Sequence, residues 1–237
     1  MPGVPGLIRV GHKGADHVAP GNTIESFEAA LEHGVDMIEF DVVRTRDGRL
    51  VLAHDWEDAE RPGCLTLDEG LDHFAGAAYG GVELIVDLKL PGYERELADG
   101  LRGRGLDGRS LVSSQYLDSL EVLGSLAPGL RRGWSVPKVR RDYTKTVLAL
   151  PAYVIARWWR ARLPGRASAL LRSGGCEALM AHWLLVSARL VAAVREAGGQ
   201  LYVWTVDDAG RIRSLEALGV DGVITNDPRL FGERAPA

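Results

Sequence analysis

The sequence predicts an α/β protein folded as a (β/α)8 TIM barrel. Eight short apolar runs rich in β-branched residues alternate with helical patterns from one end of the chain to the other, which is typical of βα units around a parallel sheet. The length of 237 residues falls within the roughly 200 to 250 that such a barrel takes as one domain. We therefore expect residues 1–237 to form a single barrel, with a doubly wound open sheet as the alternative.

Each predicted strand is a short apolar run. The eight strands are 7–11, 36–43, 83–88, 110–114, 131–136, 178–183, 201–206 and 222–226. An Asp-Gly turn at 47–48 predicts a hairpin that adds strand 50–53 to the second barrel strand.

Helical spacing of apolar residues follows most of these strands. The clearest helices are predicted at 23–33, 92–104, 117–126, 187–197 and 208–218. The first should begin at Asn22, which would form a capping box with Glu25, and should end at Gly34.

About 40 residues separate the fifth and sixth strands, far more than βα connections usually take, so we expect a helical, basic insertion at about 137–176. From Arg131 to Arg166 the chain has ten Lys/Arg and one acid, a net charge of +9, and three of the six tryptophans. The apolar run 147–156 and the pair Trp158-Trp159 favour a flap that contacts an anionic membrane surface. The alternative is that the run packs on the barrel or on a second copy of the chain, as in a homodimer.

Composition excludes several classes of protein. The net charge of −4 argues against general binding to nucleic acid. Cys64 and Cys176 lie far apart without CxxC spacing, which indicates a reducing compartment and no disulfide scaffold. No signal peptide or transmembrane helix is predicted. We expect a cytoplasmic protein, peripheral to the inner membrane face if the flap binds lipid.

Three carboxylates are predicted to meet inside the barrel. Glu39 and Asp41 are two residues apart on one strand, so their side chains share the interior face, and Asp87 lies on the next strand. A hard divalent cation, Mg²⁺ or Ca²⁺ with Mn²⁺ as a third option, would offset their repulsion and take their oxygens as ligands. The alternative is neutralisation by Arg or Lys in a structural ion pair.

Basic and imidazole groups follow the same strands. Lys89 shares a face with Asp87, so either a plain ion pair or a bound anion such as phosphate would explain it. His12 and His54 each follow a strand, and both should lie at the same mouth of the barrel. Two imidazoles there would suit a general base and a general acid. His182 also ends a strand, although the neighbouring Trp183 equally suggests local packing.

Several motifs, in order and spacing, closely resemble the glycerophosphodiester phosphodiesterase family. Five of them lie within about 45 residues: Val10–Ala15, Ala19–Phe27, Gly34–Val42, Asp47-Gly48 and His54-Asp55. Three more follow: Ile85–Lys89, Val203–Asp207 and Asp221–Pro228.

The resemblance implies a TIM barrel that hydrolyses glycerophosphodiesters to an alcohol and glycerol phosphate with a divalent cation. On the family's pattern, the acid/base pair would be His12 and His54, and the metal ligands would be Glu39, Asp41 and Asp87. Lys13 and Lys89 would bind the phosphate, and Trp204 would form part of the apolar wall of the site. His182 is an added candidate for substrate binding.

The chain departs from the family pattern at three positions. Lys13 stands where the family usually has Arg, Asp87 where it usually has Glu, and Gly21 where Glu is often found. The segment between His54 and the third strand is also short, which predicts an open mouth. The alternatives are therefore a lipid phosphodiesterase of lysophospholipase D or phospholipase C type, acting on lysophospholipid, and a non-catalytic phosphate-binding barrel.

Overall fold

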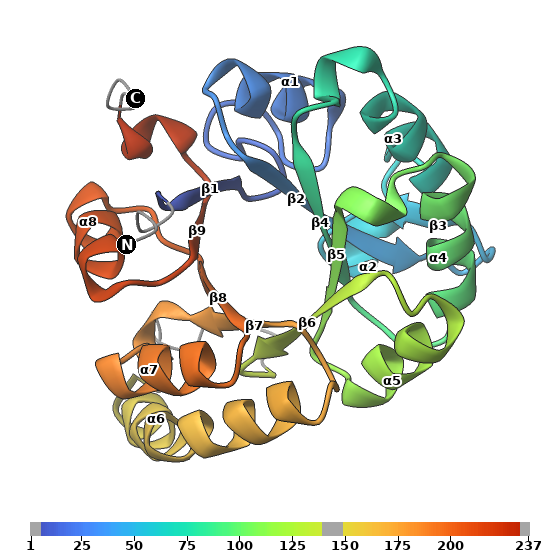
Figure 1. Cartoon of the computed structure of the whole chain (residues 1–237). Coiled ribbons are helices and arrows are strands. Elements are labelled where there is room, and N and C mark those ends of the chain that lie inside the picture. Colours follow the sequence, from blue (N-terminus) through green and yellow to red (C-terminus); the bar gives the residue numbers. More distant parts are fainter. Residues whose placement is uncertain (1–5, 139–148, 233–237) are drawn as a thin grey trace.

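A closed barrel of eight parallel strands forms the centre of the protein (Figure 1). The computed structural model describes residues 6–138 and 149–232. The strands are β1 (Ile8–Gly11), β2 (Met37–Arg44), β4 (Glu83–Leu88), β5 (Ser110–Ser114), β6 (Arg131–Val136), β7 (Ala178–His182), β8 (Gln200–Trp204) and β9 (Gly222–Thr225), with β3 (Leu50–Leu52) antiparallel to β2. Because β1 pairs with both β9 and β2, the ring of eight parallel strands is closed. The predicted barrel is confirmed, and the open sheet is wrong.

Helices surround the strands on the outside of the barrel (Figure 1). They are α1 (Ile24–Glu32), α2 (Trp56–Ala59), α3 (Leu67–Phe74), α4 (Glu94–Gly103), α5 (Leu117–Leu126), α6 (Ala149–Arg172), α7 (Ala188–Glu196) and α8 (Ala209–Leu218). Short 3₁₀ helices are η1 (Ala77–Tyr79), η2 (Asp107–Arg109), η4 (Trp183–Leu185) and η5 (Pro228–Phe231). The predicted strands and helices are all present, and their ends differ from the predicted ends by two residues at most.

The start of α1 corrects the predicted capping box. Thr23, not Asn22, is the N-cap, and its hydroxyl accepts a hydrogen bond from the backbone N–H of Ser26 at 3.3 Å. Asn22 instead takes a left-handed backbone conformation, with φ of 60°, and its side chain bonds to Asp41. The helix ends before Gly34, whose φ of 66° is the left-handed geometry expected of a residue that stops a helix.

Strand residues alternate between two apolar layers. Met37, Ile85 and Tyr202 belong to a small cluster contributed by strand residues, as expected of the barrel interior. Phe40 points the other way and stacks on Phe74 of α3, with ring centroids 5.1 Å apart. The alternation puts the residues two and four positions after Met37 on the interior face, toward the carboxyl end of β2.

The connection from β6 to β7 contains α6, a 24-residue helix where the other long outer helices have 8 to 10. Leu163, Ala167 and Leu171 are buried at helical spacing, and α6 packs beside α7 (Figure 1). The helical part of the predicted insertion is therefore confirmed for 149–172, but its second half is an ordinary outer helix of the barrel. Residues 139–148 lie outside the described residues. Within the described chain, we find no helix with the length and apolarity needed to cross a bilayer.

Candidate active site

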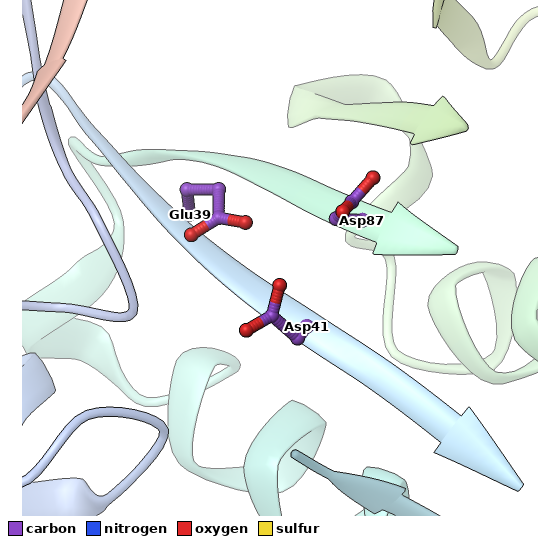
Figure 2. Close-up of side chains that lie close together, drawn as sticks. All are labelled: Glu39, Asp41 and Asp87. Atoms are coloured by element: carbon purple, nitrogen blue, oxygen red, sulfur yellow. The ribbon is translucent and has the colours of Figure 1, made fainter. Parts of the chain in front are cut away.

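Three carboxylates meet at the carboxyl ends of β2 and β4 (Figure 2). Asp41 and Asp87 are directly paired in the strand register, and Glu39 lies two residues before Asp41 on the same face. Each offers a ligand oxygen, and the three oxygens lie within 4.8 Å of one another. Asp41 is fully buried, and Glu39 and Asp87 are nearly so. The structure thus brings together the three residues that the strand spacing had suggested.

Lys89 supplies the nearest positive charge. Its Nζ lies 2.7 Å from Oδ1 of Asp41 and 2.6 Å from Oδ2 of Asp87. Burial disfavours the charged ammonium, but the two aspartates outweigh burial and hold the pKa of Lys89 above its usual range. The predicted ion pair is therefore present. It neutralises one of three negative charges.

The pKa of Glu39 shows the effect of the negative charge that Lys89 does not neutralise. Burial, and next to it the charge of Asp41, raise the pKa of Glu39 well above its ordinary value. Its Oε2 accepts one hydrogen bond, from the backbone N–H of Lys13 at 2.9 Å. Three carboxylates and one ammonium leave a formal charge of −2, and all the ligand atoms are hard oxygens. The cluster therefore fits Mg²⁺, Ca²⁺ or Mn²⁺ in charge and in ligand type.

Two neighbouring side chains orient the aspartates, and the sequence analysis missed both. Asn22 donates from Nδ2 to Oδ2 of Asp41 at 3.0 Å, and its Oδ1 accepts from the Asp41 backbone N–H at 3.1 Å. Ser113 donates from Oγ to Oδ1 of Asp87 at 2.8 Å. Ser113 could have been found, because it is paired with Asp87 in register and so shares its face. Asn22 gave no such signal, since an Asn just ahead of a helix is also typical of an N-cap.

His12 follows β1 and faces the carboxylates. Its Nε2 lies 3.9 Å from Oε2 of Glu39, and its Nδ1 lies 2.5 Å from Oδ1 of Asn226 in the loop after β9. Burial lowers the pKa of His12, which the charge of Asp41 only partly offsets. The imidazole is therefore held close to the cluster with one nitrogen directed to a fixed partner.

His54 lies in the loop after β3, and its side chain is half-exposed. Although burial favours a neutral Asp41, Lys89 first, then His54 and His12, lower the pKa of this carboxyl well below its usual range. Both predicted histidines are thus close enough to Asp41 to act on it electrostatically. One is partly buried and the other open to solvent.

The lysine after His12 forms an ion pair with a carboxylate outside the cluster. Lys13 takes a left-handed conformation, with φ of 51°, and its Nζ pairs with Oδ2 of Asp16 at 2.5 Å. Its backbone N–H, rather than its ammonium, contacts the carboxylate cluster through Glu39. An anion that bound to Lys13 would therefore compete with Asp16, a partner that the sequence did not indicate.

Trp204 and His182 form one aromatic wall. They end β8 and β7, are paired in register, and stack edge to face with ring centroids 5.2 Å apart. Trp204 packs against the interior cluster, so its ring lies on the inner side of the barrel. His182 also lies against Trp183, and its Nδ1 accepts from the backbone N–H of Leu184 at 3.3 Å. His182 therefore packs locally, which was one of its two alternatives, and its part in substrate binding stays a prediction.

Comparison with known families decides the class of protein. The model of the glycerophosphoryl diester phosphodiesterase family matches residues 12–68 and 130–230, more than half of the chain. The chain belongs to this family. The resemblance seen in the motifs is therefore confirmed, and the protein is a phosphoric diester hydrolase, as members of this family are.

Relatives of the family match nearly the whole chain. A glycerophosphodiester phosphodiesterase of Caldanaerobacter subterraneus is 27% identical over 92% of this chain and 93% of its own length. Among solved structures, a glycerophosphodiester phosphodiesterase of Agrobacterium tumefaciens has a TM-score of 0.69 at 22% identity, with 95% of this chain and 98% of that chain covered. An Oleispira antarctica phosphodiesterase in complex with the product sn-glycerol-3-phosphate has a TM-score of 0.66 at 21% identity, with 95% and 94% covered. These structural likenesses support the fold.

The family match covers part of the candidate site. His12, Glu39, Asp41 and His54 lie in its first segment, and His182 and Trp204 in its second. Asp87 and Lys89 lie between the two matched segments, so their assignment rests on the strand register and on their contacts.

Proposed function

We propose that this member of the glycerophosphoryl diester phosphodiesterase family cleaves glycerophosphodiesters to an alcohol and glycerol phosphate with the help of a divalent cation, Mg²⁺, Ca²⁺ or Mn²⁺. One observation carries the proposal: three buried carboxylates converge beside His12, and His54, after β3, also acts electrostatically on Asp41. Parallel barrels place their chemistry at this carboxyl end of the strands. The name of the Caldanaerobacter relative supports the substrate class.

Glu39, Asp41 and Asp87 are the residues that would hold the cation. A bound divalent cation supplies positive charge that stabilises the negative oxygens of a phosphodiester during cleavage. Lys89, whose ammonium lies 2.7 Å from Asp41 and 2.6 Å from Asp87, would contribute to the same stabilisation. Lys13 would join it only by leaving Asp16, and Lys89 would share its ammonium between the phosphate and the two aspartates.

His12 and His54 are proposed as the acid/base pair. One imidazole would take the proton of the attacking hydroxyl, and the other would give a proton to the leaving alkoxide. The attacking hydroxyl is either that of the substrate glycerol, which yields a cyclic phosphate first, or that of water. In the cyclic route water then opens the ring, with a second pair of proton transfers in which the acid and the base exchange roles, so both routes use the same two side chains.

Trp204 and His182 are proposed as the wall against which the substrate lies. Their rings present an aromatic surface beside the polar cluster, suited to the glycerol or alcohol part of a phosphodiester. A lysophospholipid is the alternative substrate, and the protein would then be a lipid phosphodiesterase of lysophospholipase D or phospholipase C type.

A product screen tests this proposal. The enzyme is incubated with Mg²⁺, Ca²⁺ or Mn²⁺ and with glycerophosphocholine, glycerophosphoethanolamine, glycerophosphoinositol or a lysophospholipid. Glycerol phosphate and free alcohol are the expected products from the first three. Release of lysophosphatidic acid indicates lysophospholipase D activity, and a phosphorylated alcohol with the glycerol moiety released indicates phospholipase C activity. Binding of phosphodiester without turnover in any cation indicates a non-catalytic barrel and contradicts the proposal.

The exposed side of α6 supports a second proposal, contact with an anionic membrane surface. The helix has five arginines and no acidic residue. Trp158 is 49% exposed, more than any other large apolar side chain identified as exposed, and the guanidinium of Arg162 lies 4.2 Å from its ring centre. Arginine and tryptophan together are typical of surfaces at a lipid interface. The helix belongs to the connection that leaves the carboxyl end of β6, the end of the barrel that holds the carboxylates. A homodimer through this face, and the cytoplasmic location, stay predictions.

A further inference from the structure

A chain of hydrogen bonds runs from His12 through Asn226 to Asp207. Nδ1 of His12 lies 2.5 Å from Oδ1 of Asn226, and Nδ2 of Asn226 lies 2.7 Å from Oδ2 of Asp207. Asn226 follows β9, and Asp207 lies in the loop between β8 and α8. Three separate loops at the carboxyl end of the barrel are thus joined at one imidazole.

The chemistry of Asp207 decides which way the Asn226 amide points. An ionised carboxylate only accepts hydrogen bonds, so the group that faces it must be the NH₂ of the amide. The other carboxylate oxygen, Oδ1, accepts from the Asn226 backbone N–H at 2.8 Å and from the Thr225 hydroxyl at 3.1 Å. With Asp207 held by these donors, the amide oxygen is left facing His12.

An amide oxygen next to Nδ1 in turn decides the tautomer of His12. The oxygen can only accept, so Nδ1 must carry the proton. In the neutral imidazole the lone pair then sits on Nε2, which is the nitrogen that lies 3.9 Å from Oε2 of Glu39 and so faces the carboxylate cluster. The opposite tautomer would put the lone pair on the side away from the reaction.

We propose that Asn226 is a positioning residue for hydrolysis, locked in orientation by Asp207, and that it holds His12 as the Nδ1–H tautomer so that proton transfer passes through Nε2. The inference deepens the proposed function and rests on the role given there to His12. It assigns a role to two residues at which the strand-end motifs had pointed without one.

Single substitutions should break the chain in different ways. In Asp207→Asn, the amide oxygen of the new side chain would accept the hydrogen bonds from the Asn226 backbone N–H and the Thr225 hydroxyl. The NH₂ of residue 207 would then face the NH₂ of Asn226, and two donors cannot bond to each other. The Asn226 amide then turns over or loses this partner, and His12 is no longer restricted to Nδ1–H. In Asn226→Asp, two carboxylates face each other at the position of a 2.7 Å hydrogen bond, which favours a proton on one of them or a displaced loop.

The double variant Asp207→Asn/Asn226→Asp should restore the arrangement with the two groups exchanged. Asn at position 207 can accept from the same two donors and give its NH₂ to the carboxylate at position 226. That carboxylate has a second oxygen with which to accept from Nδ1–H of His12. Recovery in the double variant would distinguish a specific hydrogen-bond chain from a general loss of packing.

The test combines spectroscopy with kinetics on the whole protein. Multiple-bond ¹H–¹⁵N spectra, recorded at a pH at which the imidazoles are neutral, report which ring nitrogen of His12 is protonated, and a His12→Gln variant assigns its signals. Wild type and the double variant should show Nδ1–H. Asp207→Asn should show Nε2–H or a mixture, with kcat on glycerophosphocholine lower by roughly 10- to 100-fold, the range usual for residues that orient a ligand or catalytic imidazole, and with KM and Mn²⁺ affinity little changed.

Two results would overturn the inference. One is Nε2–H in the wild-type protein, and the other is an altered tautomer in Asp207→Asn with an unchanged kcat. If no phosphodiester is cleaved by the wild type, the proposed function fails, whereas the ¹⁵N spectra still decide whether Asn226 sets the tautomer. Failure of the double variant to recover either the tautomer or kcat, while both single variants stay folded, would also count against the exchange of roles.

Discussion

The ammonium of Lys89 lies 2.7 Å from Oδ1 of Asp41, a carboxylate whose side chain has no exposed surface. The same ammonium is 2.6 Å from Asp87, so one cation bridges two of the three carboxylates. Glu39 is left without such a partner among the described lysines and arginines. Lys89 therefore compensates part of the negative charge in the folded protein, and enough negative charge is left for the cluster to bind a further cation.

Removing the ammonium should destabilise the metal-free protein. Lys89→Met keeps most of the side-chain volume and leaves Asp41 and Asp87 without their shared partner, so the free energy of unfolding should fall by about 3–5 kcal/mol. Millimolar Ca²⁺ or Mn²⁺ should recover part of this loss, because the cation replaces the missing charge. Urea denaturation with and without cation measures both effects.

Lys13→Met is the matched control for that variant. Lys13 pairs with Asp16, whose side chain is 26% exposed, and such pairs contribute about 1 kcal/mol or less. If Lys13→Met and Lys89→Met lower the free energy of unfolding equally, or if cation does not favour the folded Lys89→Met protein, the charge account of the cluster is wrong.

The histidine pair should be needed for turnover and not for folding. His12→Ala and His54→Ala should each lower kcat by roughly 10²- to 10⁴-fold, the usual range for a lost proton-transfer group. A substrate with a good leaving group should rescue the variant that lacks the acid and leave the other impaired. His33→Ala, at the C-terminal end of α1, is the control and should keep wild-type kinetics. Near-wild-type rates for both site variants on a poor leaving group would remove the acid/base assignment.

Local patterns were enough to predict most of the barrel. The run Glu83–Leu88 is short and mostly apolar and lies between the pair Gly80-Gly81 and Lys89, and the structure has this strand at the same ends. The side-chain period of two also predicted that Glu39 and Asp41 share a face, because that geometry follows from the strand alone. The error at Asn22 has a local cause, since Asn and Thr both cap helices and stood next to each other.

The partners of the site residues were beyond a local pattern. The bonds from Asn226 to His12 and from Asn22 to Asp41 link positions 214 and 19 residues apart. They depend on how loops from different strands meet at one rim, which the sequence order does not state. Lys13 and Asp16 are only three residues apart, but nothing in the sequence distinguished the pairing of Lys13 with Asp16 from its use by a phosphate.

Vesicle binding tests the proposed contact of α6 with a membrane. Wild-type protein should co-sediment with phosphatidylglycerol vesicles at low salt and be released at high salt, because each arginine near an anionic surface contributes about 1 kcal/mol and is screened by ions. Trp158→Ala combined with Arg157→Gln and Arg160→Gln should weaken binding most, since these side chains are exposed.

The control for the vesicle experiment is Trp56→Ala. Trp56 is 40% exposed on α2, beside the acidic Glu57 and Asp58, so its loss should leave binding unchanged. Absence of binding at low salt would end the membrane proposal. A concentration-dependent dimer that Trp158→Ala dissociates would assign this face to a second copy of the chain instead.

The central claim is that Glu39, Asp41 and Asp87 hold the divalent cation on which hydrolysis depends, and cation removal with reconstitution tests it most directly. Protein freed of metal by EDTA is titrated with Mn²⁺ in a calorimeter, and glycerol phosphate release from glycerophosphocholine is followed in the same samples. We predict that activity disappears with the metal and returns with Mn²⁺ binding, that Asp41→Asn stays folded but loses both, and that Asp99→Asn, an exposed carboxylate on α4, keeps both. Full activity in excess EDTA after verified metal removal, or unchanged Mn²⁺ affinity in Asp41→Asn, would contradict the claim.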